Sequence, residues 1–112
     1  MNELIIIPVC RAMKSEQGQL ILMHRFIEGV SAYAERWSGK VTVLLRETDK
    51  LADGLDPVVF SAEENNFDVE LLAVDINRLN ERLKDSALVL GTIANENLEI
   101  ARLCLTNSIP LV

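Results

Sequence analysis

Three short apolar runs limit what this chain can fold into: Leu4–Val9, Lys40–Leu45 and Ala87–Leu90. Each is apolar at almost every consecutive position, so both sides of the extended chain must be covered. Strands that are covered on both faces are typical of the inside of a parallel sheet, and we predict that Leu4–Val9 lies in its middle. Pro8 has no amide hydrogen, so pairing should weaken toward the end of that strand.

Segments with helical periodicity separate these runs. The first ends at Ser38–Gly39, where glycine suits a helix C-terminus, and its apolar stripe is Leu20, Met23, Ile27, Val30, Ala34 and Trp37. Further helices are predicted to begin at Asp75 and Asn95, whose side chains can cap them. This alternation predicts an α/β fold, namely a doubly wound (Rossmann-like) parallel sheet with helices on both faces, in three layers.

Residues 58–74 fit more than one structure. Val58–Phe60 can form a short strand, and the stretch from Phe67 alternates like a strand while also fitting a helical stripe. The segment is therefore one strand, two strands or partly helix. We favour a strand at about 67–74.

The chain ends with "SIPLV", residues 108–112. In a doubly wound sheet, this sequence falls where a fifth parallel strand begins, after a helix that returns the chain to the amino edge. We therefore expect residues 1–112 to be the N-terminal domain of a longer two-domain protein, cut at or near its fifth strand.

Composition and charge argue against several classes of function. The 112 residues carry 11 Lys and Arg against 17 Asp and Glu, with no basic cluster, so we expect no nucleic-acid partner. No apolar run is long enough to span a bilayer, and contact with a membrane surface is left open. One histidine and two distant cysteines predict no metal or cofactor site and indicate reduced thiols in a cytoplasmic protein.

Two loops carry the candidate site. In a doubly wound sheet, ligands bind outside the carboxyl ends of the strands where the winding direction reverses, here between the first strand and the one ending at Gly91. The loops facing that crevice are 10–18 and 92–96, and their candidate phosphate- or acceptor-binding residues are Arg11, Lys14, Ser15, Gly18, Thr92 and Asn95. Three alternatives stay open: a solvated loop, Ser15 as a helix cap, and Gly18 as a turn residue.

Two stretches of sequence resemble a known family. "HRFIEGVSAYAERWSGKVTVLLRE" and "LKDSALVLGTIANENLEIARLCLTNSIPLV" are similar to the N-terminal domain of GT-B glycosyltransferases of the group-one (family 4) kind. The resemblance covers nearly the whole chain through hydrophobic patterns. The sequence departs from the family at Gly18, where a Gly-Gly pair is common, and at Thr92 or Ile93, where the family often has His or Asp.

The resemblance implies the acceptor-side half of a glycosyltransferase. Such an enzyme moves a sugar from a nucleotide-sugar donor to a glycan or lipid acceptor, and its C-terminal domain mainly holds the donor. The full-length protein is then expected to be an enzyme and the 112 residues alone to be inactive. The alternative is a non-catalytic, flavodoxin-like regulatory or interaction domain.

Overall fold

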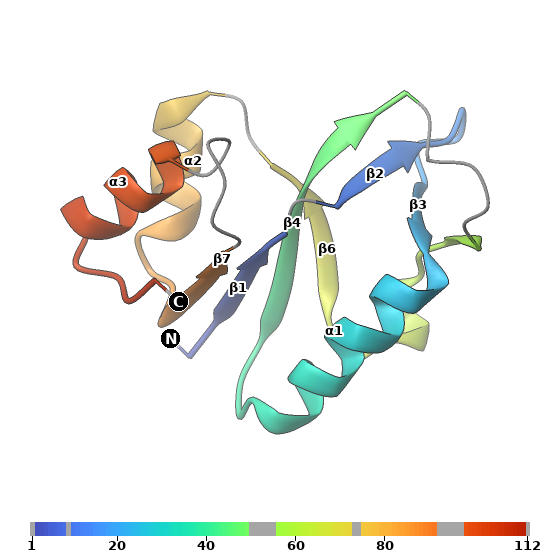
Figure 1. The fold of residues 1–112 in the computed structure, drawn as a ribbon, viewed down its shortest axis with the longest axis horizontal. Helices are drawn as coiled ribbons and strands as arrows, with labels where there is room; N and C mark the ends of the chain where they lie inside the picture. Colours follow the sequence, from blue (N-terminus) through green and yellow to red (C-terminus); the bar gives the residue numbers. More distant parts are fainter. Residues whose placement is uncertain (1, 9, 50–55, 73–74, 92–97, 112) are drawn as a thin grey trace.

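The computed structural model describes residues 2–8, 10–49, 56–72, 75–91 and 98–111. They form a mixed seven-stranded sheet and three α-helices (Figure 1). The strands are β1 (Leu4–Ile7), β2 (Arg11–Lys14), β3 (Leu20–Met23), β4 (Val41–Thr48), β5 (Pro57–Val59), β6 (Asp68–Leu71) and β7 (Leu88–Gly91). The helices are α1 (His24–Arg36), α2 (Ile76–Leu83) and α3 (Leu98–Thr106), with a short 3-10 helix at Ala62–Glu64.

Four strands form a parallel part of the sheet in the order β6-β4-β1-β7. β1 pairs in parallel with β4 on one edge and with β7 on the other, and β4 also pairs in parallel with β6. The predicted interior position of the first strand is therefore confirmed. Beyond β7, Leu111 forms a parallel bridge with Val89, so the "SIPLV" segment lies against the edge of β7.

The rest of the sheet corrects three predictions. Residues 10–18 were expected to be a loop and Leu20 the start of a helix, but β2 and β3 form an antiparallel hairpin and α1 begins at His24. β2 also pairs in parallel with β4, and β3 pairs antiparallel with β5. The sheet is therefore mixed rather than parallel throughout. The physical reason is that β3 lies between β2 and β5 with Leu22 in the buried cluster, so tertiary pairing overrides the helical spacing of these residues.

Helices cover both faces of the sheet, which explains why β1 is apolar at every position. Leu4 and Ile6 belong to one buried cluster, which also contains Ile27 and Val30 of α1. Ile5 and Ile7 belong to a second cluster, built with residues of α2 and α3 on the opposite face. Figure 1 shows α1 apart from α2 and α3, consistent with this division.

The described part of the ambiguous stretch, residues 58–72, resolves into two strands. β5 and β6 flank the 3-10 helix, so the favoured strand at about 67–74 is confirmed as β6, over a shorter range. The predicted cap of α2 is also confirmed, because the amides of Asn77 and Arg78 donate to Asp75 Oδ1 at 2.8 and 3.3 Å. The predicted cap Asn95 lies outside the described residues.

Candidate functional site

The hairpin turn between β2 and β3 holds two of the predicted site residues. The Ser15 amide donates to the carbonyl oxygen of Gln19 at 2.8 Å, and the Gln19 amide donates to Ser15 Oγ at 3.1 Å. Gly18 adopts a φ of 82°, which glycine enters without the steric cost of a Cβ. Ser15 therefore closes a turn and does not cap a helix, and the turn alone explains Gly18.

The other two residues of the first predicted loop lie on β2. Arg11 and Lys14 are both exposed, at its first and last positions. Because side chains alternate along a strand, these two residues point to opposite faces of the sheet. The structure therefore does not gather all four residues on one surface.

The second predicted loop lies outside the described residues, and with it Thr92 and Asn95. Its starting point is described: Gly91 at the end of β7 is in register with Ile7 at the end of β1. The predicted crevice begins at this pair of strand ends. Arg11, the first residue of β2, follows Ile7 closely in the sequence. Of the described site residues, Arg11 therefore lies closest in sequence to the crevice.

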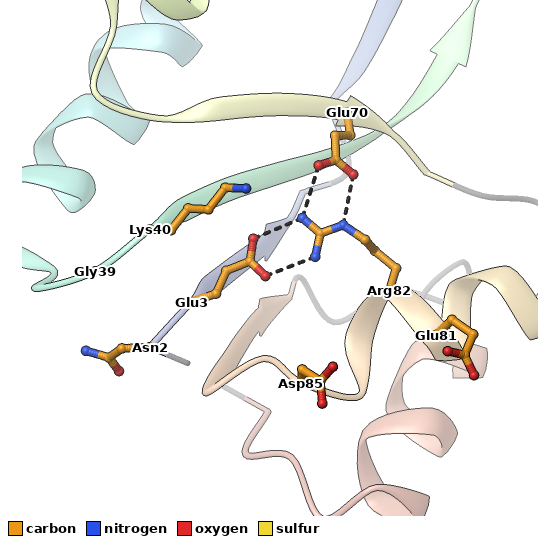
Figure 2. Close-up of a pocket in the computed structure, with 8 residues that line it drawn as sticks. All are labelled: Asn2, Glu3, Gly39, Lys40, Glu70, Glu81, Arg82 and Asp85. Atoms are coloured by element: carbon orange, nitrogen blue, oxygen red, sulfur yellow. Dashed lines mark hydrogen bonds and ion pairs between the residues drawn. The ribbon is translucent and has the colours of Figure 1, made fainter.

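The described residues also form a polar pocket at the opposite, amino edge of the parallel strands (Figure 2). Its volume is about 540 Å³, and it is lined by Asn2, Glu3, Gly39, Lys40, Glu70, Glu81, Arg82 and Asp85. These residues come from the segments before β1 and β4, from β6, and from α2 and the residues after it. The pocket thus lies far along the strands from the crevice predicted at their carboxyl ends.

One guanidinium holds two carboxylates in this pocket, as Figure 2 shows. Arg82 Nη1 and Nη2 donate to the two carboxylate oxygens of Glu3, both at 2.9 Å. Arg82 Nε and Nη2 donate to the oxygens of Glu70 at 2.9 and 3.1 Å. Thr42 Oγ1, from β4, completes the cluster by donating to Glu3 Oε2 at 2.7 Å. Such two-pronged contacts between arginine and carboxylate are among the strongest polar contacts in proteins.

The electrostatics of this cluster indicate a structural role. The hydrogen bond from Arg82 lowers the pKa of Glu3 against the opposing effect of burial, with a further contribution from Thr42. Hydrogen bonds to Glu3 and Glu70 raise the pKa of Arg82. Both groups therefore stay ionised at neutral pH, whereas a general acid or base needs a pKa near the working pH. We conclude that the cluster ties α2 to β6 and to the start of β1.

Sequence reasoning missed this cluster because its members are far apart in the chain. Glu3 and Arg82 are 79 positions apart, so only the folded sheet brings them together. Two signals were present in the sequence. Glu70 is a charged residue inside an otherwise strand-like segment, and Arg82 stands next to Leu83 on the helix that packs onto the sheet.

Three other features of the described residues bear on function: metal-binding groups, membrane-spanning helices and free thiols. Among them, no group of three or more histidine, cysteine, aspartate or glutamate side chains could hold a metal ion. Of the helices whose residues are described, none combines the length and apolarity needed to cross a membrane. Cys10 is half-buried and Cys104 is buried, and both are free thiols.

Comparisons with protein-family models, with curated proteins and with solved structures gave no match for this chain.

Proposed function

We propose that this chain is the acceptor-binding domain of a two-domain glycosyltransferase that moves a sugar from a nucleotide-sugar donor to a glycan or lipid acceptor. The observation that supports it is the strand order β6-β4-β1-β7, with Leu111 next to β7. In chain order, the parallel strands then run 3-2-1-4-5, as in a doubly wound, Rossmann-like sheet. Each domain of a GT-B enzyme, the family that the sequence resembles, is built on such a sheet.

The winding reverses between β1 and β7, which defines where the acceptor binds in this proposal. Successive connections cross to opposite faces there, so the carboxyl ends of the two strands leave an open crevice between them. Ile7 and Gly91 are in register at the ends of these two strands, at the base of the proposed crevice. Arg11 and the predicted residues Thr92 and Asn95 are the proposed contacts to hydroxyl or anionic groups of the acceptor.

The proposal also assigns the chemistry to the cleft between two domains. Transfer requires the donor and acceptor to be held in reacting geometry with water excluded, and a single wall of the cleft supplies neither condition. The 112 residues should therefore bind acceptor weakly without turnover. The two free thiols fit a reducing compartment, so the proposed location is the cytoplasm.

The test combines NMR titration and a turnover assay on the 112-residue chain. Maltose and chitobiose serve as acceptor probes, and UDP-glucose and GDP-mannose as donors. We expect amide shifts at Ile7, Arg11 and Gly91, and no sugar transfer. Turnover by this chain alone would contradict the two-domain proposal. Shifts confined to Glu3, Lys40 and Arg82 at the amino edge, or no shifts, would favour a non-catalytic interaction domain.

A further inference from the structure

Two arginines stand side by side on neighbouring strands near the proposed crevice. β2 and β4 pair in parallel with Arg11 in register with Arg46. Residues in register on adjacent strands point to the same face of a sheet, and adjacent strands are only about 4.8 Å apart. Both guanidinium groups therefore extend from one small area of the sheet.

The pattern of burial identifies the face. Ala12 and Leu45, the sequence neighbours of the two arginines, belong to the buried cluster that α1 covers. Because side chains alternate, Arg11 and Arg46 point to the opposite face, the one that α2 and α3 cover over β1 and β7. Glu47 is in register with Ala12, so its carboxylate leaves the sheet on the α1 side, away from the two arginines.

The two arginines lie near the proposed crevice at the carboxyl ends of β1 and β7. β1 and β2 both pair in parallel with β4, Leu4–Ile6 with its first part and Arg11–Met13 with its last part. The arginines thus lie just beyond the carboxyl end of β1, whose neighbour on the other side is the end of β7. In Figure 1, β2 runs upward beside the upper part of β4, beyond the end of β1.

Like charges in register on adjacent strands destabilise a sheet. This pair stands in a chain where acidic residues outnumber basic ones by 17 to 11. Both arginines also interact with other groups of the chain, so a ligand would share those partners or replace them. An oxyanion between the two would offset the repulsion, since a guanidinium binds phosphate with two parallel hydrogen bonds.

We propose that Arg11 and Arg46 bind a phosphate group of the acceptor. The inference rests on the proposed function and adds the chemical class of the substrate, a phosphorylated sugar or a lipid-linked phosphate. Two adjacent cations favour a doubly charged phosphate monoester over a singly charged carboxylate, because the Coulomb attraction scales with the charge of the anion.

The experiment is an NMR titration of the 112-residue chain with three probes: glucose 1-phosphate, glucuronate and glucose. We expect glucose 1-phosphate to bind most tightly, with shifts at Arg11, Met13, Arg46 and Thr48. Added salt should weaken its binding and leave that of glucose unchanged. Equal affinity for glucose 1-phosphate and glucose would overturn the phosphate site. Binding of glucose without glucose 1-phosphate would overturn the phosphate site and leave the proposed function intact. Binding of glucose 1-phosphate without any neutral glycan would support the phosphate site and contradict the proposed function.

Matched variants decide whether the arginine pair is responsible. Arg11→Gln should weaken glucose 1-phosphate binding by about tenfold or more, the loss typical of a hydrogen bond to a charged group. Arg25→Gln is the control, because Arg25 is exposed on α1 over the other face, and it should change affinity less than about twofold. Arg46→Lys keeps the positive charge but loses the planar guanidinium, so it should weaken glucose 1-phosphate binding. It tests Arg46 even if Arg46→Gln does not fold. Equal losses in Arg11→Gln and Arg25→Gln would overturn the assignment.

A sedimentation assay with vesicles separates the two sources of phosphate. Phosphatidic acid vesicles are compared with phosphatidylcholine vesicles. Binding of the acid vesicles that Arg11→Gln abolishes indicates a lipid phosphate, whereas binding of glucose 1-phosphate alone indicates a soluble sugar phosphate. Failure of both probes overturns the proposal.

Discussion

At the scale of single residues, Arg82 makes the most consequential polar contacts in the described structure. Its side chain is 27% exposed, and that of Glu3 is 14% exposed, so water only partly screens their ion pair. Arg82→Ala leaves the Glu3 carboxylate partly buried without this donor, and we expect a loss of about 1–3 kcal/mol in the free energy of unfolding. Urea denaturation followed by circular dichroism measures it.

Lys84 provides the matched control for that variant. It forms an ion pair with Glu81 at 2.8 Å on the surface of the molecule, where such pairs contribute little. Lys84→Ala should therefore leave the urea midpoint unchanged. If the two variants behave alike, the Arg82 cluster does not fasten α2 to the sheet.

Gly39 is a second residue with a precise steric role. A Cβ at this position would lie 2.0 Å from the carbonyl oxygen of Asn2, which also accepts a hydrogen bond from Trp37 Nε1 at 3.0 Å. We expect Gly39→Ala to cost about 1–3 kcal/mol, the usual range for overpacking. Gly29→Ala is the comparison, because a Cβ there meets no atom within 4 Å and helical alanine should add about 0.5–1 kcal/mol. Thermal denaturation of both variants would show shifts of opposite sign.

At the scale of elements, α1 is attached to the sheet through its apolar side. Ile27 and Val30 are buried in the cluster with Leu4 and Leu22, whereas Tyr33 is 58% exposed. Ile27→Ala should therefore destabilise the fold by about 2–5 kcal/mol, the range for a truncated core aliphatic. Tyr33→Ala should change stability by less than about 0.5 kcal/mol. A small effect of Ile27→Ala on chemical denaturation would mean that this side of α1 is not packed as described.

The sequence alone predicted those elements whose apolar pattern fits only one type of secondary structure. β1, β4 and β7 could be predicted because each must be buried on both faces, and Asp75 could be predicted as a cap from its chemistry. β3 could not, since Leu20 and Met23 continue the helical spacing of Ile27 and Val30 and also suit a strand. Pairing with β2 and β5 decided the outcome, and that pairing depends on tertiary structure.

The candidate site was predictable to a smaller extent. Arg11 was identified from its place after the first strand, but its partner Arg46 depends on the register between β2 and β4. That register is set by packing between segments far apart in sequence and leaves no local pattern. Of the alternatives for these residues, the turn role of Gly18 is confirmed, whereas Ser15 closes a hairpin that was not expected and does not cap a helix.

At the scale of the whole molecule, one carboxylate should shape the stability of the fold at acidic pH. Arg82 lowers the pKa of Glu3 below its ordinary value of 4.5, so the unfolded chain takes up this proton at a higher pH than the folded one. The stabilisation is complete well above 4.5 and is lost as the pH falls through 4.5 toward the folded-state pKa. Urea midpoints measured across this range should fall more steeply for the wild type than for Glu3→Gln. Parallel curves would contradict this account.

β4 has a consequence for how this molecule can move. Its eight residues pair with three strands, β1 and β6 along its first part and β2 along its last part. Among the described strands it is the one that joins the parallel part of the sheet to the hairpin. The hairpin can therefore tilt only if the last third of β4 twists with it. That twist is transmitted through β4 to the strands at the centre of the fold. A ligand that binds β2 and β4 together would therefore hold the hairpin at a fixed angle to the parallel part of the sheet.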